Sequence, residues 1–483
     1  MPSEPNDQPA PLALDDAAPP PPPTQQVPRI AYLAVASALL MEFIDSTALS
    51  TALPTLAEAF HADPVHLKLA LTSYILALAV FIPISGWAAE RFQPRRVFLT
   101  AMAVFLIGSV LCGFSSSLGE LVAARIVQGI GGAMMTPVAR LIVVGSSTRE
   151  TLIKAMGWFT TPALVGPLIG PPLAGFVLSV ADWPWIFFIN LPIGLIGMAA
   201  VVRYVPKIAV ADPGPFDWSG FFLTALAVTG IVVVAETAGL NLMPPWAQAS
   251  VVAVALLCGW QYVRSSRRKV RPILDLTLLQ YPTFRSSLIG GALMRLGVGA
   301  SPFLMPLLLQ VGLGWSPLQA GAVTLASGLG VFTARPFAAP LLKRWGFRTM
   351  LLVFVAMTAV LTAAPGFFRP ETPVVLIMGI LLFAGFSRSS QFIATNTIAY
   401  ADVPQTSIAQ ASTLAAVSQQ IGLAMGVSFG GLMLHLARGD GGALTPDRFT
   451  WPYIAIGATT LLAAVVYWRL DRNAGSELSG NRR

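Results

Sequence analysis

Charge is scarce in this chain. Only 11% of its 483 residues are Asp, Glu, Lys or Arg, while 55% are hydrophobic; a typical soluble domain is about 25% charged. A soluble protein of this length would need polar surface that the sequence does not have. The apolar residues fall in runs of about 20, the length that crosses a bilayer as a helix. Strand-like alternation is absent, so the composition indicates an all-helical, polytopic membrane protein rather than a barrel.

Residues that bind metals or phosphates are also rare. Cys112 and Cys258 each lie alone in an apolar run, and His61, His66 and His435 lie near expected loops. Neither set has metal-ligand spacing, so we expect no metal and no cofactor. No phosphate-binding Gly-rich loop occurs, which argues against ATP as the energy source. No nucleophile and base are arranged for catalysis, so an enzyme is disfavoured. The basic residues behind the net charge of +8 form no single patch, so we expect no nucleic-acid partner.

Apolar runs and the breakers between them predict fourteen membrane-spanning helices. Their expected ranges are 30–56, 69–89, 97–115, 118–144, 152–180, 185–205, 217–237, 246–263, 285–311, 317–341, 349–367, 372–399, 406–436 and 450–469. Lys and Arg in short loops favour the cytoplasmic side of a membrane. If the N-terminus is inside, the cytoplasmic segments hold 20 such residues and the opposite loops hold 4, namely Lys68, Arg369, Arg438 and Arg448. Both termini are therefore predicted to be cytoplasmic.

A weak internal repeat predicts the domain organisation. The basic turns in GWAAERFQPRRVFL and AAPLLKRWGFRTMLL follow the second and the tenth expected helix. They indicate two six-helix halves, an arrangement common among transporters. We expect a disordered, Pro-rich tail over 1–28, an N-terminal bundle over 29–205 and two inserted helices over 206–263. A cytoplasmic linker over 264–284, a C-terminal bundle over 285–470 and a tail over 471–483 complete the chain.

Two acids interrupt the first apolar run. Asp45 lies about 22 Å along the first expected helix, and Glu42 lies one turn away on nearly the same face. An acid in hydrocarbon costs roughly 2.5–3.5 kcal/mol, so both should face protein or a water-filled cavity. Burial disfavours the charged form, which suits such a group to binding and releasing a proton. The alternative is a fixed ion pair or a hydrogen-bonded neutral acid. Arg125, expected at a similar depth, is the basic partner, either switching between conformations or paired permanently.

Small residues dominate the helices around this pair. Gly129, Gly131 and Gly132 follow Arg125 and allow another helix to approach closely. The fifth expected helix, TTPALVGPLIGPPLAGF, carries four prolines within eleven residues together with Gly166, Gly170 and Gly175. It is predicted to be kinked and tightly packed, because proline removes backbone hydrogen bonds and glycine removes side-chain bulk.

These stretches resemble motifs of the major facilitator superfamily, and more narrowly of its fourteen-helix drug:proton antiporter family. The first helix is similar to the Asp-x-Thr … Ala-Leu-Pro pattern through Asp45, Thr47 and Pro54, with Ser50 where Asn is usual; Glu42 lies outside it. Arg125 to Ala133 matches Arg-x-x-Gln-Gly-x-Gly-Gly-Ala. The antiporter motif of the fifth helix matches through four residues, Gly166, Gly170, Pro171 and Gly175.

Further motifs extend the resemblance to about residue 430. The loop GWAAERFQPRRVF is similar to the superfamily's cytoplasmic gate motif, with Glu90 for Asp and Gln93 for Gly. Its matching gate residues are Gly86, Glu90, Arg91, Arg95 and Arg96. WPWIFFINLPIG, FLMPLLLQVGLGWSPLQAG and SQQIGLAMGV resemble later helices of the family.

The resemblance implies a proton-coupled antiporter of a bacterial inner membrane. It would export amphipathic organic compounds, such as drugs or toxic metabolites, by alternating access, with Asp45, Glu42 and Arg125 coupling the proton. It implies a monomer and leaves room for a periplasmic adaptor protein. A proton symporter that imports a small metabolite shares the fold and stays open, as does, less favoured, a membrane sensor that transports nothing.

Polar residues within other expected spans are candidates for a substrate cavity. They are Gln128, Arg295, Arg388, Gln391 and Asn396. An arginine in a span is usually paired or faces a cavity. Arg295 and Arg388 would bias a cavity toward anionic or zwitterionic cargo, and an equal alternative is a structural role, such as capping a helix break.

Overall fold

The computed structural model describes residues 28–147, 151–207, 213–238, 243–269, 271–404, 407–439 and 442–479, so that most of the expected N-terminal tail and the last four residues lie outside it. The described residues are helical and contain no strand. Thirteen helical segments among them are long and apolar enough to cross a membrane. The expected all-helical fold is confirmed.

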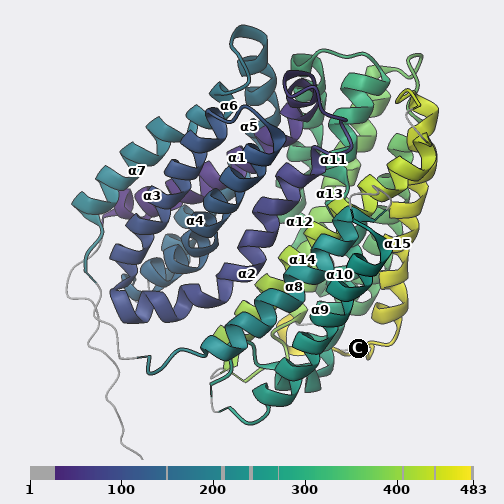
Figure 1. Ribbon diagram of the computed structural model, residues 1–483. Coiled ribbons are helices and arrows are strands. Elements are labelled where there is room, and N and C mark those ends of the chain that lie inside the picture. Colours follow the sequence, from purple (N-terminus) through teal and green to yellow (C-terminus); the bar gives the residue numbers. More distant parts are fainter. Residues whose placement is uncertain are drawn as a thin grey trace, which may run out of the picture.

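The first half of the chain forms one helical bundle, purple to blue in Figure 1. Its elements are α1 (Arg29–Ala59), α2 (Lys68–Phe92), α3 (Pro94–Gly113), α4 (Leu118–Gly145), α5 (Leu152–Val180), α6 (Trp185–Phe188) and α7 (Asn190–Tyr204). The helix α5 is continuous through all four prolines. Ser117 caps α4 by accepting a hydrogen bond from the backbone N–H of Glu120, which satisfies one of the free donors of the first turn.

The second half forms the green and yellow bundle of Figure 1. Its elements are η1 (Leu276–Gln280), α10 (Pro282–Gly299), α11 (Ser301–Pro306), η2 (Leu307–Gly312), α12 (Pro317–Ala363), η3 (Ala364–Phe367), α13 (Val374–Ile398), α14 (Ile408–Arg438), η5 (Pro446–Phe449), α15 (Thr450–Trp468) and α16 (Ser476–Ser479). At 47 residues α12 is too long for one crossing. It bends at Gly346, whose φ of 73° is non-helical, so α12 makes two crossings and the described spans number fourteen.

Two helices stand between these halves in the chain, α8 (Trp218–Thr237) and α9 (Pro245–Ser266). They pair with each other, and α8 also contacts α2 of the first bundle and α14 of the second. In Figure 1 they lie in front of the second bundle. Asp217 caps α8 and binds Lys269 beyond α9, which ties the two ends of the pair together. Burial raises the pKa of Asp217, but hydrogen bonds from Lys269, Gly220 and Ile273 outweigh it and hold that pKa below its usual value.

A buried ion pair fastens α8 to both bundles. Glu236 of α8 lies 3.5 Å from the ammonium of Lys68 on α2, and both side chains are almost fully buried. The hydroxyls of Thr72 on α2 and Ser428 on α14 donate to the same Glu236 oxygen, at 2.5 and 2.6 Å. Lys68 was expected in a loop on the side opposite the cytoplasm. The structure corrects this, because the first turn of α2 buries its charge against a helix about 170 residues away in sequence.

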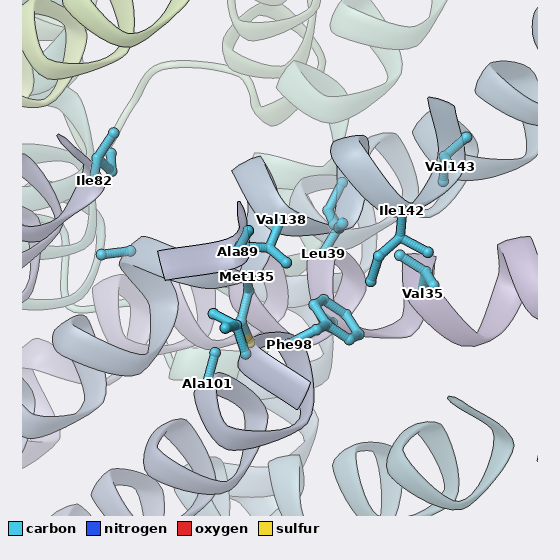
Figure 2. Packing of buried hydrophobic residues seen from close by; sticks show 14 of the residues in the cluster. Val35, Leu39, Ile82, Ala89, Phe98, Ala101, Met135, Val138, Ile142 and Val143 are labelled. Carbon is cyan, nitrogen blue, oxygen red and sulfur yellow. The ribbon is translucent and has the colours of Figure 1, made fainter. Parts of the chain in front are cut away.

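Aliphatic and aromatic side chains fill the first bundle. Phe98 of α3 packs among residues of α1 and α4 such as Val35, Val138 and Ile142 (Figure 2). Glycines bring α3 and α4 close: a Cβ added at Gly131 would lie 2.5 Å from the backbone nitrogen of Phe105. The expected close approach at the α4 glycines is therefore present, and it places the polar side chains of α3 and α4 next to α1.

Candidate functional site

Asp45 is the centre of a buried polar cluster in the first bundle. It is 1% exposed. One carboxylate oxygen lies 2.5 Å from the guanidinium of Arg125. The other accepts hydrogen bonds from Gln128 at 2.8 Å and from Asn190 at 2.9 Å. All three neighbours donate hydrogen bonds to Asp45, which fits an ionised carboxylate. A protonated Asp45 would carry a hydrogen of its own, and that hydrogen would point at one of these donor groups instead of at an acceptor. A protonated Asp45 therefore requires these contacts to change.

The rest of the cluster holds Arg125 and the two amides in place. Arg125 donates through Nε to the carbonyl of Ala70 at 3.2 Å, and its guanidinium lies 4.3 Å from the ring centre of Tyr74. Ser109 of α3 accepts from Gln128 at 2.8 Å and from Asn190 at 3.1 Å. Side chains from α1, α3, α4 and α7, with the backbone of α2, thus form one hydrogen-bonded network around this carboxylate. A change in these hydrogen bonds would alter contacts of five helices of the bundle.

Glu42 occupies a second polar position one turn along α1. It is half-buried and accepts a hydrogen bond from the hydroxyl of Thr136 on α4 at 2.9 Å. No ion pair to Glu42 occurs among the described residues. Glu42 and Asp45 therefore face the same neighbour, α4, but only Asp45 is neutralised by a cation.

The antiporter-motif glycines of α5 pack against both halves of the molecule. A Cβ at Gly166 would lie 2.5 Å from Cβ of Phe43, and one at Gly170 would lie 1.9 Å from the hydroxyl of Thr47. A Cβ at Gly175 would lie 2.5 Å from the carbonyl oxygen of Pro317 on α12. Pro171 also contacts α12, through its carbonyl beside Gly321. The motif thus lets α5 lie between α1, which carries Asp45, and the second bundle.

A cavity of about 190 Å³ lies between the two bundles. From the first bundle, α1 contributes Thr47, Ser50 and Thr51, and α5 contributes two prolines. The second bundle contributes residues of α11, α12, η3 and α13, including Ser327 and Arg388. Arg388 is the one charged residue among the described lining residues, and it donates to the hydroxyl of Ser327 at 2.8 Å. The cavity is therefore positive, and hydroxyls supply most of its other polar groups.

The five residues that were predicted to line a substrate cavity lie in different surroundings. Arg388 is among the lining residues of this cavity, whereas Gln128 is a ligand of Asp45. Asn396 accepts from Gln419 of α14, and Gln391 is buried with neither amide atom bonded to a described residue. Arg295 is 5% exposed and lies over the ring of Phe392.

The gate-motif residues lie at the turn between α2 and α3. Gly86, Glu90, Arg91 and Arg96 are exposed, and Arg95 donates to the carbonyl of Val202 on α7. Glu90 stands where the gate motif has an Asp. Within the described part of the chain Glu90 makes no ion pair.

Three contacts close the side of the cavity toward the α1–α2 loop. Asp63 of that loop pairs with Arg438 at the end of α14, at 2.6 Å. Gln310 of η2 donates to the carbonyl of Thr51 at 2.7 Å. The third is the Gly175–Pro317 approach of α5 and α12. At the opposite ends of the bundles, Arg140 of α4 and Ser412 of α14 lie 3.4 Å apart.

Two helical bundles joined by a helix pair, with a cavity and a buried acid between membrane-spanning helices, are the architecture of a membrane transporter. The Major Facilitator Superfamily profile matches residues 35–268 and 287–483, and the chain belongs to that superfamily. It is thus a multi-pass membrane transporter of small molecules and not an enzyme. The resemblance drawn from the motifs is confirmed.

The sequence relatives are bacterial proteins named for drug resistance. The "Putative multidrug resistance protein MdtD" of Pectobacterium carotovorum is 34% identical over 442 residues, covering 90% of this chain and 94% of that protein. The protein of the same name from Klebsiella pneumoniae is 33% identical over 460 residues, covering 93% and 96%. Among solved structures, a D-xylose-proton symporter aligns with a TM-score of 0.68 at 15% identity, covering 92% of this chain and 98% of that one. That likeness shows the fold alone.

Sequence reasoning missed several residues of the site. Asn190 and Ser109 bind the same cluster as Asp45, yet only the resemblance of INLPIG to a family motif pointed to Asn190, and it gave no role. A polar residue in the first turn of an apolar span was the available signal. Lys68 and Glu236 were missed as a pair because nothing local joins them.

Proposed function

We propose that the chain is a proton-coupled antiporter that exports amphipathic organic compounds across a bacterial inner membrane, with both termini cytoplasmic. The observation that carries this is the carboxylate of Asp45, buried between membrane-spanning helices and bound by three donors. An ionisable residue inside a membrane span marks a functional site by default, and proton relays are among the roles that acids there perform. The names of the relatives support export, and the basic loops support the orientation.

The proposed cycle links Asp45 to the cavity through α1. Thr47, Ser50 and Thr51 line the cavity and follow Asp45 within two turns of the same helix. In the state seen here Asp45 is paired with Arg125, and contacts close the α1–α2 loop side. In the proposed cycle cargo leaves with Asp45 deprotonated, and Asp45 takes up a proton once the α1–α2 loop side has opened. Protonation removes the charge that holds Arg125, so that α1 and α4 can shift. Because Gly170 packs on Thr47, α5 moves with α1, and the cavity opens inward again, where the proton leaves.

Energy from the proton gradient is sufficient for such a cycle. One proton crossing 100 mV supplies about 2.3 kcal/mol, and each pH unit adds about 1.4 kcal/mol. A cavity of about 190 Å³ is smaller than the roughly 300–1,000 Å³ of drug-sized pockets. The bundles must therefore separate further to admit a larger cargo, or the cargo is small. Glu42 is proposed as a second proton-binding group, on the path between the Asp45 cluster and the N-terminal end of α1.

The test is pH-gradient-driven transport in proteoliposomes for Asp45→Asn. A panel of tetraphenylphosphonium, chloramphenicol and taurocholate covers cationic, neutral and anionic cargo, and a pH-sensitive dye reports proton movement. We expect opposite movement of proton and cargo in the native chain and none in Asp45→Asn. The matched control is Asp182→Asn, an exposed acid of the α5–α6 connection. Coupling that survives in Asp45→Asn rules out the proposal, and movement of proton and cargo together indicates a symporter instead.

A further inference from the structure

The second bundle carries positive charge without a matching acid. Its long helices α10, α12, α13, α14 and α15 contain no Asp or Glu. They do contain Arg295 and Arg388, which the fold places away from the bundle ends. Neither makes an ion pair with any described residue. An ionised group in a low-dielectric interior is costly unless it is paired, so a charge left without a partner calls for an explanation.

The two arginines differ in what they can reach. Arg295 is 5% exposed and is enclosed by its own bundle, with the Phe392 ring centre 5.3 Å from its guanidinium. Arg388 lies on the wall of the central cavity, where its one hydrogen bond to a described side chain goes to Ser327. A guanidinium has five N–H donors, so most of those of Arg388 remain for a partner in the cavity.

The opposite wall cannot supply that partner. The first bundle lines the cavity with hydroxyls and prolines, and Asp45, its nearest buried acid along α1, is already held by Arg125 and two amides. A ligand in the cavity therefore meets one formal charge, which is positive, surrounded by hydroxyls such as Thr47 and Ser327. Carboxylates match the planar fork of an arginine with two parallel hydrogen bonds.

We propose that Arg388 is the specificity-determining residue of the cavity and binds the carboxylate of an anionic or zwitterionic organic cargo. The inference rests on the proposed function in taking this cavity as the cargo site. It narrows that function from amphipathic compounds in general to compounds with a carboxylate-like group. Arg388 acts in binding and takes no part in handling the proton.

The experiment compares three probes of nearly equal shape that fit a small cavity. Benzoate is anionic, benzamide is neutral and benzamidinium is cationic. Their affinities are measured by calorimetry on the purified full chain in lipid nanodiscs, at one pH and with no gradient. For the native chain we expect benzoate to bind roughly 10- to 100-fold more tightly than benzamide, the size of a charge-assisted hydrogen-bonded pair, and benzamidinium to bind least well.

Variants assign the preference to one side chain. Arg388→Met should abolish the higher affinity for benzoate while changing the affinity for benzamide by no more than about twofold. Arg388→Lys should keep part of the preference for benzoate, because the positive charge remains but the two parallel N–H donors of the guanidinium do not. Arg335→Met is the matched control, since Arg335 is an exposed arginine of α12 outside the described cavity lining and should leave all three affinities unchanged. Chloride is varied to test whether a simple anion competes.

Three results would overturn the proposal. The first is a native chain that shows no preference for benzoate, including one that binds none of the probes. The second is an Arg388→Met variant that binds all three probes equally more weakly. Competition by chloride with equal potency would make the site one for inorganic anions and would also overturn it. Because no gradient is present, binding does not depend on proton coupling. A chain that binds benzoate through Arg388 but moves no cargo would refute the proposed function alone.

Discussion

Arg125 on α4 and Arg388 on α13 lie in the same local pattern and in opposite surroundings. Each is followed three residues later by a glutamine, Gln128 or Gln391. In the first bundle both members of the pattern bind the carboxylate of Asp45. In the second bundle the long helices carry no acid: Arg388 faces the cavity, and Gln391 is buried without a described partner.

The sequence pattern therefore does not decide the role of the arginine. A buried arginine that is paired with an acid of its own bundle loses that partner only when the acid is protonated. Such a pair therefore suits a proton-binding site. A charge left open on a cavity wall is available to a ligand. The two bundles would thus divide the work, the first handling the proton and the second recognising cargo, with α5 packed between them at Gly170 and Gly175.

Removing the two arginines one at a time should have very different effects on the stability of the protein. Arg125→Met leaves the Asp45 carboxylate buried without a cation and should cost about 3–5 kcal/mol of unfolding free energy. Arg388→Met removes a charge that has no acid partner and should change stability by less than about 1 kcal/mol. Thermal unfolding of the purified proteins in one detergent provides the measurement.

A double variant serves as the control for that prediction. Asp45→Asn combined with Arg125→Met removes both charges, so most of the lost stability should return although proton coupling does not. If Arg125→Met and Arg388→Met destabilise the protein equally, the two arginines have equivalent partners and the contrast between the bundles is wrong.

The sequence predicts the helices well and the site only in part, for physical reasons. Hydrophobic length defines membrane spans directly, so the ranges around α1 to α5 agree with the structure within a few residues. The depth of Asp45 and Arg125 along their helices suggested that they could pair, and they do. The rotation of each helix about its axis is set by neighbours far away in sequence. For that reason the contrast between Gln128 and Gln391, and the contact of Lys68 with Glu236, could not be predicted.

A substitution in the cavity can give Arg388 the acidic partner that it lacks. Ser327→Asp would place a carboxylate where a hydroxyl now accepts from Arg388 at 2.8 Å, and so make the second bundle resemble the first. The added acid should compete with benzoate and weaken its binding roughly tenfold or more. Ser327→Asn, of the same shape but uncharged, is the control and should weaken binding less. Equal losses in both would point to the size of the new side chain rather than its charge.

A smaller contrast between the halves lies in their repeated basic turns. Gln93, between α2 and α3, has a φ of 71°, and Gly346, at the bend of α12, has a φ of 73°. A positive φ destabilises the folded state by about 1–3 kcal/mol at a non-glycine residue. A glycine avoids this strain but loses about 0.5–1 kcal/mol of stability, because its unfolded chain has more conformational freedom. Gln93→Gly should therefore stabilise the protein by about 1 kcal/mol, whereas Gly346→Gln should destabilise it by a similar or larger amount. Thermal midpoints of both variants in one detergent check the prediction, and a Gln93→Gly that unfolds earlier than the native chain would mean that the Gln93 side chain contributes more than its backbone costs.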